Sequence, residues 1–160
     1  TTTGLLATGF LQLLRNRDQW EALCRDPGLI PNAVEELLRF CTPVLAAKRK
    51  VNHATRVGDT DLPAGANVLL LLGSANHDEA VFPGGDGLDV CRQSAGRHLA
   101  FGHGIHFCLG APLARLEAQV VLQELTASLP QARLVEPQEI SFSRNTTFRS
   151  PQQLLVEWDA

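Results

Sequence analysis

FGHGIHFCLGAPLAR, residues 101–115, joins a glycine-punctuated loop to the start of a long helix. Gly102, Gly104 and Gly110 allow the backbone to pass close to a large flat object, where a Cβ atom would clash. Cys108 lies just ahead of the helix, where backbone N–H groups and the positive end of the helix dipole stabilise a thiolate. The segment therefore predicts a thiolate loop at a close-packed site.

The residues alone leave more than one role open for this cysteine. A lone cysteine is most often a small buried hydrophobe. Together with His103 and His106, Cys108 could hold zinc, although a fourth ligand at suitable spacing is missing. A thiolate beside a flat cavity could instead ligate haem iron and leave the opposite iron face free for oxygen. A dinucleotide fingerprint is rejected, because its third glycine and preceding strand are missing.

The composition is that of a globular chain, either one domain or part of a larger one. Its 160 residues are 44% hydrophobic and 19% charged, which excludes a disordered or coiled-coil protein. Lys and Arg number 14 against 17 Asp and Glu, and this net charge of −3 gives no basic face for nucleic acid. No stretch reaches the ~18 apolar residues of a membrane span, so we expect no membrane association.

Cysteine and methionine usage add two expectations. The four cysteines lie far apart without a CxxC pair, which favours reduced thiols and a cytoplasmic location. Methionine is absent, so we expect a sequence that was processed or that begins inside a longer one. We interpret it as a C-terminal piece.

Hydrophobic spacing and turn residues predict a mainly α chain with small antiparallel β-sheets. Helices are expected over 1–15, 18–25, from Pro31 to before Pro43, and over 112–128. The apolar positions of the last helix include Leu113, Leu116, Val120 and Leu125. Strands are expected over 45–51, 55–57, 68–72, 133–135, 140–143 and 154–158.

The segment 101–115 resembles the cysteine-ligand loop and following helix of soluble bacterial cytochromes P450. The motif's fixed positions are all present, namely Phe101, Gly102, Gly104, His106, Cys108, Gly110, Leu113, Ala114 and Arg115. Upstream, Glu36-Leu37-Leu38-Arg39 resembles the family's ExxR helix at the expected distance. Residues 63–65 and 69–78 resemble the strand and short helix between these motifs, and TTTGLL resembles the second half of the oxygen-binding helix. The resemblance assigns residues 1–160 to the C-terminal portion of a cytochrome P450 domain, less than half of a full-length member.

The resemblance implies roles for individual residues around haem b. Cys108 is implied as the proximal thiolate ligand of the haem iron, with Phe101 shielding the sulfur. Gly102, Gly104 and Gly110 give the loop its approach to the ring. His106 and Arg49 correspond to positions that bind the haem propionates, since a buried dianionic edge needs cationic or N–H donors.

The ExxR pair is implied to be buried structural support that fixes the loop before the cysteine. Glu36 and Arg39 lie three residues apart on one helical face. The family usually adds an arginine in a Pro-x-Arg-Phe segment, whereas Gly87 occupies that position here. We predict that Arg92 or backbone carbonyls replace it, because a buried charge without a partner is costly.

The remaining site residues concern oxygen and substrate. Thr1 corresponds to the threonine that, with a preceding acidic residue, delivers protons to iron-bound oxygen. Substrate contacts are implied for Val44, Leu45 and Ala46, which follow the ExxR helix. The tip of a late hairpin, with Thr147, is implied to add further contacts.

The function implied by the resemblance is a haem-thiolate monooxygenase that inserts one oxygen atom of O2 into a small hydrophobic organic substrate. Electrons would come from a ferredoxin or flavodoxin with its NAD(P)H-dependent reductase, because no flavin or NAD(P)H fingerprint is present. Docking is expected beside a modest basic patch, made of Arg97, His98, His103 and Arg115. Two alternatives stay open: a truncated, non-catalytic fragment with weak or no haem binding, and a peroxide-driven haem-thiolate oxidase.

Overall fold

The computed structural model describes residues 1–159 and confirms the mainly helical architecture with small antiparallel sheets. The helices are α1 (Thr2–Arg15), α2 (Arg17–Arg25), α3 (Ile30–Phe40), α4 (Leu72–Ala75) and α5 (Ala111–Ser128). Short 3₁₀ turns are η1 (Pro27–Leu29), η2 (Ala95–Arg97) and η3 (Gly104–His106). The helices predicted over 1–15, 18–25 and 112–128 are confirmed within one residue at each end.

The helices begin and end where the sequence chemistry requires. Pro31 lies in the first turn of α3, where its missing N–H has no intrahelical partner to lose. The next proline, Pro43, lies beyond the end of α3, because proline cannot continue a helix. α5 begins at Ala111, directly after the glycine loop, and Pro112 lies in its first turn. The cysteine loop is therefore fixed at its C-terminal end to the longest helix of the described residues.

The strands form three two-stranded antiparallel sheets within residues 1–159. β1 (Ala47–Lys50) pairs with β4 (Asn67–Leu70) so that Arg49 lies opposite Val68. β2 (Thr55–Val57) pairs with β3 (Thr60–Leu62), and β5 (Arg133–Leu134) pairs with β6 (Val156–Glu157). β3 was not predicted, since Asp59 and Asp61 disfavour a strand.

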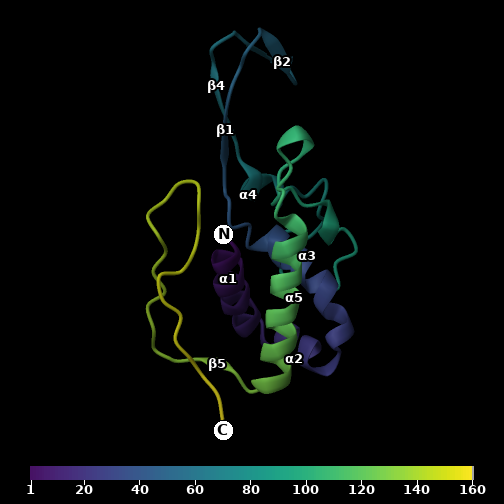
Figure 1. Ribbon diagram of the computed structural model, residues 1–160, viewed down its shortest axis with the longest axis vertical. Helices are drawn as coiled ribbons and strands as arrows, with labels where there is room; N and C mark the ends of the chain where they lie inside the picture. Colours follow the sequence, from purple (N-terminus) through teal and green to yellow (C-terminus); the bar gives the residue numbers. More distant parts are fainter. Residues whose placement is uncertain (160) are drawn as a thin grey trace.

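The predicted strand over 140–143 is wrong. This segment makes only an isolated antiparallel bridge between Phe142 and Pro151. Pro151 has no N–H with which to extend a ladder. Residues 140–143 therefore belong to an irregular loop, which Figure 1 shows in yellow-green beside α1.

The core lies between α1, α2, α3 and α5. Leu11, Leu13 and Trp20 are fully buried, and the Trp20 indole N–H donates to the Pro130 carbonyl at 3.0 Å. On α5 the buried positions are small or late in the helix, such as Ala118 and Leu122. Leu113, Leu116 and Val120 are exposed by 58%, 57% and 46%. The sequence pattern of α5 located apolar positions correctly but did not show that these three face away from the described core.

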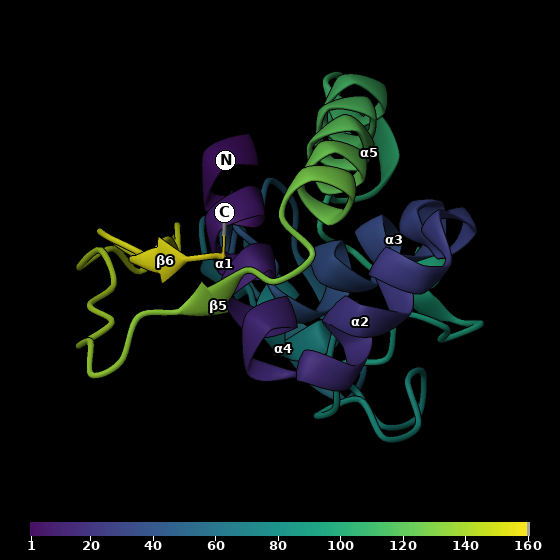
Figure 2. The ribbon, with the colours of Figure 1, turned by 90° about the horizontal axis from the view of Figure 1, so that it is seen from below.

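The three-dimensional arrangement separates a helical body from a projecting hairpin. Figure 1 shows β1 and β4 extending from the helices, with the loop before α5 at the same end of the molecule. Figure 2, viewed from below, shows α5 beside the group formed by α1, α2 and α3. Within residues 1–159, no helix is both long and apolar enough to cross a membrane.

Candidate functional site

The cysteine loop is held by its own backbone. The Cys108 N–H donates to the Phe101 carbonyl at 3.0 Å, and the Phe107 N–H donates to the Gly104 carbonyl at 3.0 Å. Gly102 and Gly104 have φ angles of +72° and +71°, a region that side chains with a Cβ rarely occupy. Glycine at these two positions therefore lets the segment curl tightly ahead of α5.

The structure places Cys108 at the surface of a cavity rather than inside packed aliphatics. Its side chain is exposed and lines a cavity of about 640 Å³. The alternative of a buried structural cysteine is therefore wrong. Zinc binding also lacks support, because no three His, Cys, Asp or Glu side chains of residues 1–159 are grouped to hold a metal ion.

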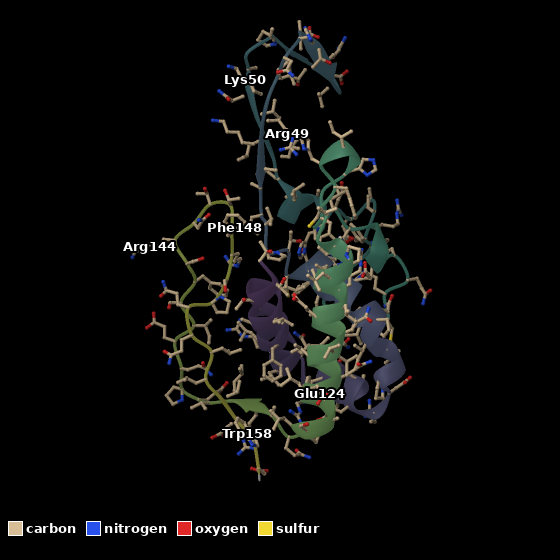
Figure 3. The ribbon with its side chains drawn as sticks, viewed as in Figure 1. Arg49, Lys50, Glu124, Arg144, Phe148 and Trp158 are labelled. Carbon is tan, nitrogen blue, oxygen red and sulfur yellow. The ribbon has the colours of Figure 1, made fainter. Side chains whose placement is uncertain are left out.

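The cavity brings together most of the predicted site residues from four separate segments. Those that line it are Thr1, Val44, Arg49, Phe101, Gly102, His106, Cys108 and Gly110. Its other walls are mainly aliphatic, from Leu38, Leu70, Leu72, Leu99 and Leu113. Figure 3 shows the Arg49 side chain extending from the hairpin toward the loop ahead of α5. The cavity thus has an exposed thiol, basic groups from Arg49, His103 and His106, and mainly apolar walls, and Glu117 adds one carboxylate to its lining.

These features fit a haem group. The cavity volume lies in the range of about 300–1,000 Å³ that suits large organic ligands. A Cβ atom added at Gly110 would lie 3.9 Å from the Cys108 sulfur, an ordinary van der Waals distance, so Gly110 adjoins the thiol. The basic side chains of Arg49 and His106 line the same cavity, where they could meet an anionic ligand edge.

The remaining substrate candidates, Leu45, Ala46 and Thr147, do not line the cavity. The Leu45 N–H donates to the Thr147 carbonyl at 2.7 Å, so the late loop is joined directly to the segment after α3. Ala46 is buried, with 6% of its surface exposed. Of the four predicted substrate contacts, Val44 is the one that lines the cavity. The structure therefore brings the two predicted segments together, with Val44 next to the thiol cavity.

The ExxR pair forms a fully buried ion pair. The Arg39 guanidinium donates from Nε to Glu36 Oε2 and from a terminal nitrogen to Glu36 Oε1, both at 2.8 Å. Both side chains are 0% exposed. This pair satisfies the condition for a buried charge, which is a close partner together with further hydrogen bonds.

Arg92 supplies the missing cation, as predicted. Its Nε lies 3.2 Å from Glu36 Oε1, and its terminal nitrogens donate to the carbonyls of Pro83, Gly84 and Gly87. Backbone carbonyls contribute as well, since Arg39 donates to those of Asn76, Gly85 and Gly87 at 2.8, 2.8 and 3.0 Å. Both proposed replacements for the absent arginine are therefore present, and Gly87 takes part through its carbonyl.

Sequence reasoning missed Glu35, which lies one residue before the ExxR glutamate. Its Oε1 accepts from Arg115 Nε at 2.7 Å and its Oε2 from Arg115 Nη2 at 2.9 Å. Oε2 also lies 3.2 Å from His98 Nε2. Burial alone would raise the pKa of Glu35, but the hydrogen bonds from Arg115 and His98 outweigh it and lower the pKa to about 2.

This cluster corrects the predicted docking patch. His98 is buried, with Nδ1 3.1 Å from the Ala100 N–H and Nε2 3.2 Å from Glu35 Oε2, so its ring is held inside the fold. Arg115 forms an ion pair with Glu35, so its charge is already paired within the fold. Only Arg97 and His103 of the four predicted residues are exposed.

The sequence did contain one signal for the role of Glu35. Adjacent helical residues point about 100° apart, so Glu35 and Glu36 must meet different partners.

Comparisons with known proteins agree with this geometry. A family model described as Cytochrome P450 matches residues 15–129. Cytochrome P450-SU2 of Streptomyces griseolus is 44% identical over 160 residues, covering 99% of this chain and 40% of that protein. A steroid C26-monooxygenase of Mycobacterium tuberculosis is 46% identical over 150 residues, covering 94% and 40%. The chain thus spans about 40% of the length of these curated relatives.

Solved structures show the same fold at high similarity. The heme domain of a cytochrome P450 from Acinetobacter radioresistens superposes with a TM-score of 0.96 at 39% identity, covering 99% of this chain and 38% of that one. An intact type IV self-sufficient cytochrome P450 monooxygenase gives a TM-score of 0.96 at 46% identity, covering 99% and 21%. With the family model matching most of the chain and the thiol cavity in place, the chain belongs to the cytochrome P450 family of haem proteins.

Proposed function

We propose that this chain provides the thiolate side of a haem monooxygenase, with Cys108 as the iron ligand. The observation that carries the proposal is the exposed Cys108 thiol on an apolar cavity that also receives Arg49 and His106. A ligand thiolate must be accessible and reduced, and Cys108 is a free thiol. We extend the proposal to a cytoplasmic location, where thiols stay reduced.

The residues of the loop would hold haem b in the following way. Cys108 binds the iron, and Phe101, which lines the cavity beside it, limits access of water to the sulfur. Gly102 and Gly104 maintain the curl of the loop by their positive φ angles. Arg49 and His106 donate to the propionates, because two carboxylates leaving water need charged or N–H partners.

When bound, the haem supplies redox chemistry with O2, and an anionic sulfur ligand favours O–O cleavage. The chain's own contribution is positioning, exclusion of water and control of protons. The aliphatic side chains Leu38, Leu72 and Leu99 keep water from the cavity. Thr1, also on the cavity wall, would hold a proton at its hydroxyl beside the site that the haem would occupy.

The substrate and the electron donor follow from the same surface. A small hydrophobic molecule fits walls of this kind, with Val44 as a contact from the segment after α3. Leu45, Ala46 and Thr147 support that segment through the Leu45–Thr147 hydrogen bond. A ferredoxin or flavodoxin with its NAD(P)H-dependent reductase would supply the electrons, docking beside the exposed Arg97 and His103.

The test is reconstitution of the 160-residue chain with haemin, followed by reduction under CO. The wild-type chain should give the red-shifted Soret band of a thiolate ligand. Cys108→Ser should lose that band, whereas Cys91→Ser, which removes the other exposed cysteine, should keep it. Persistence of the band in Cys108→Ser would contradict the assignment.

A second candidate is a chain that holds haem weakly or not at all and has no activity of its own. The exposure of Leu113, at 58%, on the cavity wall favours it, because an apolar site open to water binds a cofactor poorly. Absence of any Soret shift in the wild-type chain would support this second candidate.

A further inference from the structure

We propose that Glu35 is a positioning residue that holds Phe101, and with it the Cys108 loop, in place. The meaning of this role rests on the proposed function, in which Cys108 is the iron ligand. Glu35 lies on α3, far from the cysteine in sequence, and does not line the thiol cavity. Its influence on the loop must therefore pass through other side chains.

The first link is the pair of donors that Glu35 holds. Arg115 is bound by two parallel hydrogen bonds of 2.7 and 2.9 Å, a geometry that fixes the plane of its guanidinium. His98 is fixed at both ring nitrogens, by Glu35 on one side and by the Ala100 N–H on the other. One carboxylate thus sets the orientation of two flat groups that come from different segments.

The second link is the contact of both flat groups with Phe101. The Arg115 guanidinium carbon lies 4.7 Å from the centre of the Phe101 ring. The His98 ring centre lies 5.7 Å from it, with the two planes inclined by 58°. A cation over a ring face is attracted by the ring quadrupole, and the planar guanidinium suits this position better than an ammonium group.

The third link runs from Phe101 to the cysteine. The Phe101 carbonyl accepts the Cys108 N–H at 3.0 Å, so a shift of Phe101 moves the backbone of the cysteine. The Phe101 ring also packs edge to face on Phe107 at 6.2 Å, next to Cys108 in sequence. The contacts from Glu35 to Cys108 are therefore continuous, each with a stated distance.

The experiment measures amide hydrogen exchange by mass spectrometry on the full chain without haem. In Glu35→Gln, peptides that cover residues 101–108 should exchange faster by about 2- to 30-fold, the equivalent of losing 0.5–2 kcal/mol of coupling. Peptides of α1 should exchange at the wild-type rate. The matched control is Glu21→Gln, which breaks the exposed Arg17–Glu21 pair on α2 and should leave residues 101–108 unchanged.

An equal acceleration in α1 and in residues 101–108 would overturn the proposal, because it would show that Glu35 only stabilises the whole chain. An unchanged rate in residues 101–108 would overturn it as well. If Glu35→Gln does not fold, Arg115→Lys serves as the second variant. It loses the planar contact with Phe101, so peptides that cover residues 101–108 should exchange faster than in the wild type, by a smaller factor than that expected for Glu35→Gln.

The route through Phe101 has its own test. In a Phe101→Leu background, Glu35→Gln should add less than about a twofold change in residues 101–108, because the intermediate contact is already lost. A full additional effect would contradict the route. Since haem is absent from these measurements, their failure leaves the outcome of the haemin experiment unaffected, and the two proposals fail separately.

Discussion

The two ion-pair systems of α3 differ in burial although their glutamates are neighbours in sequence. Glu36 and Arg39 are fully buried and surrounded by carbonyl acceptors, whereas Glu35 and Arg115 keep 19% and 31% of their side chains exposed. The Glu36 system joins α3 to the loop before η2, and the Glu35 system joins α3 to the Phe101 side of the cysteine loop. One helix therefore has a fully buried pair within the fold and a partly exposed pair that contacts the Phe101 side of the cysteine loop.

The largest effect is expected from breaking the buried pair. Arg39→Met leaves the Glu36 carboxylate with Arg92 and the Asp89 N–H as its donors, and it removes the donor to the carbonyls of Asn76 and Gly85. The free energy of unfolding, measured with urea, should fall by about 3–5 kcal/mol. The control is Arg56→Met, which breaks exposed ion pairs with Asp59 and Asp61. A loss for Arg39→Met as small as that of Arg56→Met would show that the buried pair does not support the fold.

The next effect concerns the cation that replaces the family's arginine. Arg92→Met should lower the free energy of unfolding by about 2–3 kcal/mol, because Glu36 loses a partner while Arg39 remains. A Cβ atom at Gly87 would meet only the Gly84 carbonyl, at 3.6 Å. We expect Gly87→Arg in the Arg92→Met background to recover part of the loss. If the second substitution lowers stability further, the guanidinium does not reach Glu36 from position 87.

The third prediction uses acid to separate the Glu35 pair. The pKa of Glu35 is lowered from 4.5 to about 2, so its stabilisation is complete above pH 4.5 and is lost as pH falls toward 2. The free energy of local opening of residues 101–108, measured by amide hydrogen exchange, should differ by roughly 2 kcal/mol between wild type and Glu35→Gln near neutral pH, after allowance for partial exposure. This difference should shrink as the pH is lowered. A difference that stays constant with pH would contradict the link to this carboxylate.

The smallest effect on stability should come from the cysteine itself. Cys108 is exposed and packs against little, so Cys108→Ser should change the unfolding free energy by less than about 0.5 kcal/mol. By contrast, Cys41 is buried, and burial raises the pKa of its thiol to about 12. Cys41→Ser should destabilise the chain measurably more in the same urea experiment. Equal losses would show that the Cys108 loop is part of the core.

Local signals made much of this fold predictable. Proline and glycine positions determined where helices begin and end, and the missing arginine at Gly87 led to Arg92, because a buried charge requires a partner. The exposed face of α5 was not predictable, since the spacing of Leu113, Leu116 and Val120 shows a stripe but not what covers it. The partners of Glu35 were missed because His98 and Arg115 lie 63 and 80 residues away from it in the sequence, and local patterns do not show which residues meet over such a distance.

The most direct test of the central claim is X-ray absorption at the iron edge of the haem-loaded chain. Cys108 as the iron ligand predicts a bonded sulfur in the wild-type chain and in Cys91→Ser, and its loss in Cys108→Ser. Only nitrogen and oxygen ligands around iron in the wild-type chain, or a bonded sulfur that persists in Cys108→Ser, would contradict it.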